Sequence, residues 1–217
     1  MKCTLCPAAL IGLSLLAGGS LIALAQPEKS GAPAKGQPEK AQPDHQMQPD
    51  MAKMMAAMEA ASTPGANHKL LEQWIGTWDT TMKIMMPGAP AMESKGRAEV
   101  SWLFEGRWLQ ERVDGDMMGQ PMKGLSIIGY DNFNKCFVSS WVDNHSTAMI
   151  TSTGSLDQTG KVLTMFGRMD EPMTGEHNKT VRFQTTFVDK DTRKFTIDEV
   201  QYGQPFTVVE ITYKRAK

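Results

Sequence analysis

The feature that most constrains the fold is an alternation of apolar and polar residues that begins after Gly76 and continues to the C-terminus. A period of two places successive side chains on opposite faces of a β-strand. We identify ten such runs, separated by short turns rich in Gly, Asn and Asp. They are 77–86, 93–104, 107–117, 122–130, 135–143, 148–156, 161–169, 179–188, 194–202 and 205–215. Connections this short predict antiparallel neighbours, because they leave no room for crossover helices.

An open sheet of this many strands would leave two edges with unpaired backbone groups. Closing the sheet on itself removes both edges. We therefore predict an all-β fold over residues 68–217, an antiparallel up-and-down β-barrel of ten strands preceded by short N-terminal helices.

One end of such a barrel needs a plug, and the residues around Gly76 suggest how it is built. Apolar residues at helical spacing predict a short helix over 69–75, with Asn67 as its N-cap and Gly76 as a left-handed residue at its end. Trp78 follows at the start of the first strand, so its indole is expected to close the barrel. Arg215, late in the last run, is expected to stack on that indole.

The Gly-x-Trp start with a closing arginine resembles the calycin superfamily of lipocalin-like barrels. A closer resemblance extends from His68 to the C-terminus. Its motifs occur in order as PGAP at 87–90, GRWL at 106–109, GYD at 129–131, WVD at 141–143, DEPMTG at 170–175 and EITY at 210–213. Together they resemble the bacterial domain-of-unknown-function family 1579, a calycin-like family. The resemblance implies the barrel fold and frequent export, and it brings no activity.

The N-terminus has the pattern of a secretory signal. Lys2 precedes an uncharged apolar stretch over 8–24, and a small-x-small sequence ends at Ala25. We predict a signal peptide over 1–25, cleaved after Ala25, and a periplasmic or secreted protein with no membrane insertion after cleavage. An uncleaved membrane anchor is the alternative. Residues 26–50 are rich in Pro, Gln and Lys and predict a disordered spacer.

Residues 51–67 carry a methionine stripe on a predicted helix. Met51, Met54, Met55 and Met58 lie at i, i+3, i+4 and i+7 and so share one helix face. Thioethers suit Cu(I), and a methionine face also suits a protein partner. We favour the simpler interpretation that this face packs on the barrel, because no His or Cys lies close to it.

Charge and ligand spacing exclude several classes of function. The formal net charge is -1, without a basic cluster, so nucleic acid is not expected as a partner. Cys3 and Cys6 form a C-x-x-C that is lost with the signal peptide. His68 and His177 have no metal-ligand spacing to each other, and no late histidine suits haem, so we expect neither metal nor cofactor.

The inner face of the predicted barrel supplies the candidate ligand-binding residues. Taking Trp78 as inward and following the alternation, we expect Trp102, Met82, Met165, Phe183 and Glu199 to line the lumen. The alternative for Glu199 is a solvated position near the rim of the barrel. A barrel wider than the eight-stranded kind has room for a ligand, and we expect small inward residues such as Gly167 and Ala98 to leave that space. The predicted function is binding of a small apolar molecule.

Two other functions remain open. The barrel can instead be filled by its own side chains and act as an interaction module of the cell envelope. An enzyme would use Asp143 and His145, whose spacing allows a carboxylate-oriented base. No nucleophile motif lies near them, so we assign no catalytic residue. In the fifth run the inward face is ambiguous between Phe137 with Trp141 and Val138 with Val142.

Overall fold

The computed structural model describes residues 47–172, 174–200 and 203–217. The predicted signal peptide and nearly all of the predicted spacer lie outside these residues. Helices α1 and α2 and a 3-10 helix, η1, precede ten strands. The helices are α1 Met47–Ser62, α2 Ala66–Leu70 and η1 Leu71–Trp74. The strands are β1 Gly76–Ile84, β2 Met92–Leu103, β3 Trp108–Met117, β4 Gln120–Asp131, β5 Cys136–Asp143, β6 Ile150–Leu156, β7 Val162–Glu171, β8 Glu176–Asp189, β9 Thr192–Glu199 and β10 Phe206–Arg215.

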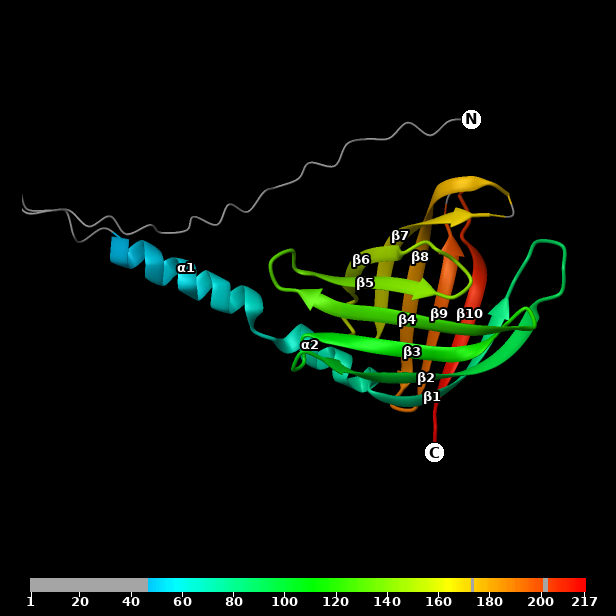
Figure 1. The fold of residues 1–217 in the computed structure, drawn as a ribbon, viewed down its shortest axis with the longest axis horizontal. Helices are drawn as coiled ribbons and strands as arrows, with labels where there is room; N and C mark the ends of the chain where they lie inside the picture. Colours follow the sequence, from blue (N-terminus) through cyan, green and yellow to red (C-terminus); the bar gives the residue numbers. More distant parts are fainter. Residues whose placement is uncertain (1–46, 173, 201–202) are drawn as a thin grey trace, which may run out of the picture. The chain divides into compact units, whose positions relative to one another are not determined.

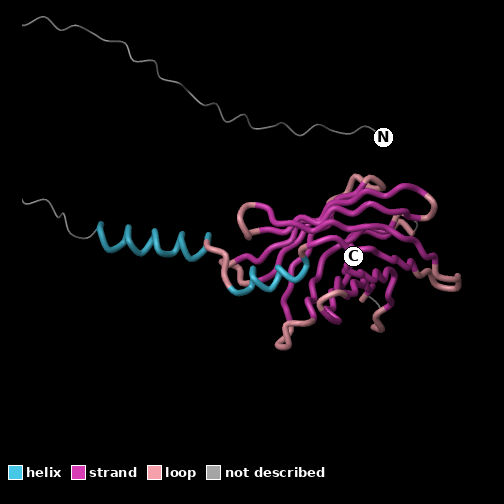
Figure 2. The backbone as a smooth tube through the Cα atoms, turned by 90° about the horizontal axis from the view of Figure 1, so that it is seen from below, coloured by secondary structure: helices cyan, strands magenta, loops and turns pink. Residues whose placement is uncertain are grey.

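The strands form one closed antiparallel barrel, as the sequence predicted. Each strand pairs with the next in the chain, and β1 pairs with β10 to close the sheet. Figure 1 shows the strands following one another around the wall in chain order. Figure 2 shows that helical segments precede the strands and that only loops and turns connect them. Closure leaves no free sheet edge among the ten strands, which is the reason we gave for a barrel.

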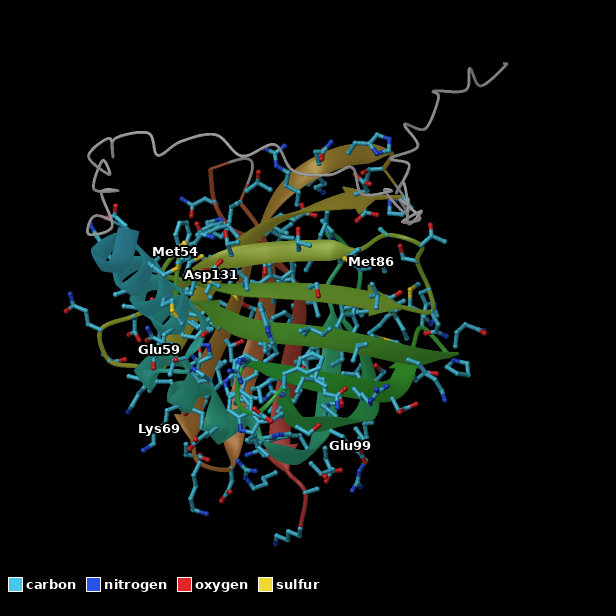
Figure 3. All side chains as sticks on the ribbon, turned by 60° about the vertical axis from the view of Figure 1, so that its left-hand side comes forward. Met54, Glu59, Lys69, Met86, Glu99 and Asp131 are labelled. Atoms are coloured by element: carbon cyan, nitrogen blue, oxygen red, sulfur yellow. The ribbon has the colours of Figure 1, made fainter. Side chains whose placement is uncertain are left out.

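The alternation places successive side chains on the outer face of the barrel and in its lumen. On β2, buried Ala98 and Val100 alternate with exposed Glu99, which points outward in Figure 3. The ambiguity in the fifth run is settled in favour of Phe137, which is buried, and of Trp141, which lines the lumen.

The helices differ in detail from the prediction. The N-cap of α2 is Gly65, not Asn67, and the Gly65 N–H donates to Nδ1 of His68 at 3.1 Å. The predicted single helix over 69–75 is instead split between α2 and η1. Gly76, at the junction between η1 and β1, has a φ of 125°. Residues with a side chain rarely adopt this backbone conformation.

The methionine stripe of α1 does not pack on the barrel, so that interpretation was wrong. Met51, Met54, Met55 and Met58 are all 52–64% exposed, and Figure 3 shows Met54 on the helix. The end of α1 is held to the barrel by polar contacts: the Asn132 side chain donates to the carbonyls of Ala60 and Ala61 at 3.2 and 3.3 Å. Within the described residues, no helix is both long and apolar enough to cross a membrane.

Candidate functional site

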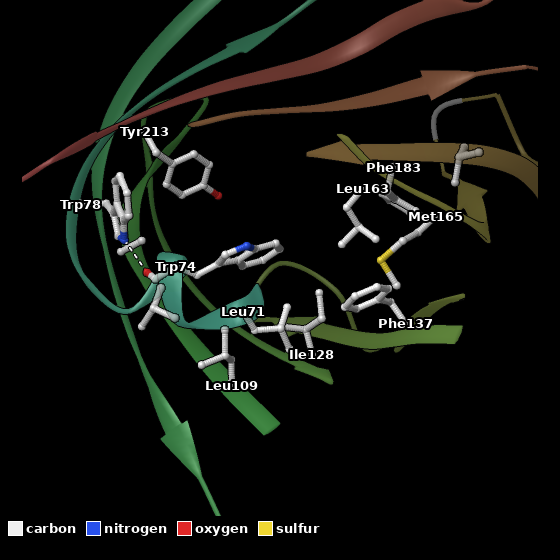
Figure 4. Close-up of a cluster of buried hydrophobic side chains, with 13 residues drawn as sticks. Leu71, Trp74, Trp78, Leu109, Ile128, Phe137, Leu163, Met165, Phe183 and Tyr213 are labelled. Carbon is white, nitrogen blue, oxygen red and sulfur yellow. Dashed lines mark hydrogen bonds between the residues drawn. The ribbon is translucent and has the colours of Figure 1, made fainter. Parts of the chain in front are cut away.

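One end of the barrel, which we call the floor, is closed by Trp78 and Arg215. The Trp78 side chain is 1% exposed, and its indole N–H donates to the carbonyl of Trp74 at 2.8 Å (Figure 4). The Cζ of Arg215 lies 4.2 Å from the centroid of the Trp78 ring. Arg215 also donates to the carbonyl of Ile75 at 2.8 Å. A methyl group at Gly76 would lie 2.7 Å from Nη1 of Arg215, so a larger residue there would displace the guanidinium.

A second tryptophan extends the floor into the lumen. Trp74 ends η1, and its ring lies between Leu71 and Tyr213 in Figure 4. Arg193 of β9 packs among the floor rings, with its Cζ 3.7 Å from the Tyr213 centroid and 4.8 Å from that of Trp74. A guanidinium stacked on aromatic faces in this way is held by cation–π attraction as well as by packing.

The charge of Arg193 is neutralised by a buried carboxylate. Nη2 of Arg193 donates to Oε1 of Glu111 at 2.7 Å, and the two side chains are 2% and 8% exposed. The pair joins β9 to β3 across the floor. Burial, together with the nearby Glu111 carboxylate, raises the pKa of Tyr213, so its hydroxyl stays protonated at neutral pH.

Above the floor lies a cavity of about 300 Å³. Its apolar lining comes from every strand except β2, and includes the predicted residues Met82, Met165 and Phe183. The other apolar side chains of the wall are Val113, Met117, Met122, Ile128, Trp141, Ile150, Leu163, Met169, Phe195, Ile197, Val209 and Ile211. A lumen with this lining has the character of a small-molecule site.

Two pairs of polar groups on the cavity wall are hydrogen-bonded to one another. The Ser139 and Ser152 hydroxyls lie 2.7 Å apart, and the Trp141 indole N–H donates to Oδ2 of Asp143 at 2.8 Å. Groups that already have partners offer little to a ligand, so this part of the wall behaves as an apolar surface.

Two predicted lumen residues do not line the cavity. Gly76, the first residue of β1, pairs with Val100 of β2. Trp102 is two residues further along β2, so it lies beyond the floor and packs against the core from outside the cavity. Glu199 is the last residue of β9, at the end of the strand away from Arg193 and the floor. It accepts a 2.6 Å hydrogen bond from Nζ of Lys179.

The cavity also has a different origin from the one we expected. A methyl group on Gly167 would lie 2.3 Å from the carbonyl oxygen of Thr151, so this glycine lets β6 approach closely and leaves no space. Ala98 is fully buried and lies outside the lining. The space comes from the width of the ten-stranded barrel.

The catalytic candidates do not form a dyad. Asp143 accepts the backbone N–H of His145 at 2.9 Å, while Nε2 of the exposed imidazole lies 3.2 Å from the carbonyl of Pro121. The Asp143 carboxylate therefore does not orient the ring as a base would require. No group of three or more His, Cys, Asp or Glu side chains suited to a metal occurs within the residues the structure describes.

His68 and His177, which the sequence analysis did not assign to a metal site, lie in different surroundings. His68 is buried against the edge of Tyr130, with ring centroids 5.9 Å apart. Burial lowers the pKa of His68, and a backbone hydrogen bond at Tyr130 offsets only part of that effect. His177 is exposed, with Nδ1 3.3 Å from Oδ1 of Asp170.

The sequence analysis missed Arg193 and Glu111. The ninth run was started at Lys194, one residue too late to include Arg193, although Arg193 has the same parity as Phe195 and Ile197. Glu111 shares the inward parity of Leu109 and Val113 on β3. A charged residue at an inward position in each of two strands was the available signal.

The family model for the protein of unknown function DUF1579 matches residues 63–215. The chain belongs to the DUF1579 family. No curated protein matches it. The DUF1579 barrel is similar to the crystal structure of Rv2717c from M. tuberculosis, with a TM-score of 0.53 and 12% identity over 71% of this chain and 100% of that one.

The barrel also matches the S-type phycobiliprotein lyase CPES from Guillardia theta, with a TM-score of 0.48 and 12% identity over 71% of this chain and 99% of that one. Likeness at such low identity extends to the fold of Rv2717c and no further. The function of the DUF1579 chain has to be argued from its own lumen.

Proposed function

We propose that the barrel binds a small, mainly apolar molecule in its lumen. The observation that carries the proposal is the cavity of about 300 Å³ enclosed by methionine, aliphatic and aromatic side chains. A barrel acting only as an interaction module would be expected to fill this space, because empty volume next to apolar side chains costs packing energy.

The size of the cavity sets the class of ligand. Along β3 the lining residues Glu111, Val113, Gly115 and Met117 extend from the floor toward the other end of the barrel. Six residue steps correspond to about 20 Å of strand. The shape therefore suits one elongated molecule, and burial of its apolar surface contributes about 25 cal/mol per Å² before the costs of association.

The test is saturable binding of a neutral apolar fluorophore such as diphenylhexatriene to the purified protein, followed by probe emission. Ile150→Trp, which adds volume to the lining, is expected to weaken binding at least about ten-fold. Thr151→Trp is the matched control, because the neighbouring Thr151 is exposed on the outer face. It is expected to bind like the parent.

Absence of saturable binding by the parent would reject the proposal and favour the interaction module. Equal affinity of both variants would mean that the probe binds outside the lumen. Urea midpoints of the two variants establish that each is folded before affinities are compared.

We propose further that the protein is exported and that the barrel acts in the periplasm or outside the cell. The support is the apolar stretch and the small-x-small site before Gln26. N-terminal sequencing of the envelope fraction is expected to begin at Gln26, and a sequence that begins at Met1 would contradict cleavage.

A further inference from the structure

The floor of the lumen carries hydrogen-bond donors without partners. Among the side chains that the structure describes, the buried nitrogens that lack a partner are Nε1 of Trp74 and Nε of Arg193. Trp74 is 5% exposed and Arg193 is 2% exposed, and both line the cavity. Both nitrogens donate and neither can accept. An unpaired buried donor of this kind costs about 1–3 kcal/mol.

We propose that these donors are the anchor for a neutral hydrogen-bond acceptor, such as a carbonyl oxygen, at the end of an otherwise apolar ligand. The ligand enters with this end first and leaves its apolar part against the wall. This inference rests on the proposed binding function and names the ligand class for the same site. In Figure 4 the Trp74 ring lies below Tyr213, and both residues line the cavity.

The local charge favours a neutral acceptor over a carboxylate. Arg193 already has a buried anionic partner in Glu111, 2.7 Å away. A ligand carboxylate would therefore be a second negative charge beside a guanidinium that Glu111 already neutralises, and desolvating it would cost several kcal/mol. A carbonyl oxygen accepts the same N–H donors and has a far smaller desolvation cost.

The wall supplies a natural control for the floor. The indole N–H of Trp141 also belongs to a cavity-lining tryptophan, but it already donates to Asp143 at 2.8 Å. A ligand acceptor would have to displace Asp143 to reach it. Trp74→Phe and Trp141→Phe thus remove two lumen N–H groups that differ in whether a partner is present.

The experiment compares three linear probes of equal chain length: an alkane, a methyl ketone and a carboxylic acid. Their affinities are measured by displacement of diphenylhexatriene at neutral pH. The ketone is expected to bind the parent about five- to ten-fold more tightly than the alkane, the ratio expected of one net hydrogen bond. The ionised acid is expected to bind more weakly than the ketone.

In Trp74→Phe the ratio of ketone affinity to alkane affinity is expected to fall at least about three-fold, because only the Arg193 donor remains, and taking the ratio within one variant cancels the effect of the smaller ring on both probes. In Trp141→Phe the preference for the ketone is expected to persist. A proton–nitrogen NMR spectrum of the parent gives a readout that needs no variant: the ketone, but not the alkane, is expected to shift the indole N–H signal of Trp74.

The outcomes separate the two proposals. Binding of alkane and ketone with equal affinity, or tighter binding of the acid than of the ketone, overturns the neutral-acceptor anchor and leaves the apolar lumen in place. A ketone preference that survives Trp74→Phe undiminished overturns the role of Trp74. Failure of every probe to bind overturns the proposed function itself.

Discussion

The buried pair of Glu111 and Arg193 should make the barrel sensitive to the loss of one charge and tolerant of the loss of both. Glu111→Leu leaves a guanidinium that is 2% exposed without the carboxylate at 2.7 Å. Removing one partner of a buried ion pair typically costs about 3–5 kcal/mol.

The structure places the expected cost toward the lower end of that range. Arg193 keeps its contacts with the Tyr213 and Trp74 rings, 3.7 and 4.8 Å from its Cζ, and these contacts stabilise the cation when the carboxylate is gone. We therefore expect Glu111→Leu to lower the free energy of unfolding by about 3 kcal/mol. A domain with about 5–15 kcal/mol of stability remains folded after such a loss.

The double variant Glu111→Leu/Arg193→Met removes both charges and keeps apolar volume on both sides. Replacing a buried pair by apolar side chains is often close to neutral, but here the stacking on the floor rings is lost as well. We expect the double variant to lie about 1 kcal/mol below the parent, and so to recover about 2 kcal/mol relative to Glu111→Leu.

The assay is urea unfolding of the parent, both single variants and the double variant, followed by tryptophan fluorescence and circular dichroism together to check two-state behaviour. The reasoning is refuted if Glu111→Leu costs less than about 1 kcal/mol, or if the double variant loses as much as the sum of the two single variants. Either result would mean that the pair contributes nothing that depends on both charges.

Three further predictions concern stability. Gly76→Ala is expected to lower it by about 1–3 kcal/mol, and by more than Gly88→Ala, because both have a positive φ but only Gly76 would also collide with Arg215, as paired urea titrations will measure. Trp78→Ala is expected to cost roughly 3–5 kcal/mol, and an unchanged urea midpoint would contradict its role as the plug. The pKa of His68 is lowered from 6.5 in the folded state, so the unfolded chain takes up the proton first and stability is lost as pH falls below 6.5. That loss, measured by urea unfolding across this range, is expected to be smaller in His68→Gln.

The sequence was sufficient for the fold because the barrel is built from local regularities. Alternation identifies each strand, short turns identify its neighbours, and the number of strands makes closure favourable. The plug was also predictable, since a glycine between a helical pattern and Trp78 marks a change of direction that few other residues allow. These signals lie within a few residues of one another in the chain.

The contents of the lumen were less predictable because they depend on residues far apart in the sequence. Alternation indicates that Glu111 and Val113 face inward, but it does not indicate which residue meets Glu111 across the floor. Glu111 and Arg193 are separated by 82 residues, and by six strand pairings in chain order or four across the β1–β10 closure. Trp102 was expected in the lumen because the alternation predicts which face of β2 it occupies. The alternation does not predict how far along the barrel the residue lies.

The same separation accounts for the unpaired donors at the floor. Trp74 is placed by η1 and by the hydrogen bond that its carbonyl accepts from Trp78, whereas Arg193 is placed by β9, by Glu111 and by the floor rings. Each residue has a structural reason to be there that leaves one N–H unused. Closing the barrel therefore produces a polar point at the end of an apolar lumen, and the proposed anchor residues Trp74 and Arg193 are in direct contact with the plug residue Trp78. Changing Arg193 would alter stability and binding together, whereas Trp74→Phe keeps an aromatic ring in place, removes the N–H together with part of the ring, and leaves the Trp74 carbonyl free to accept from Trp78.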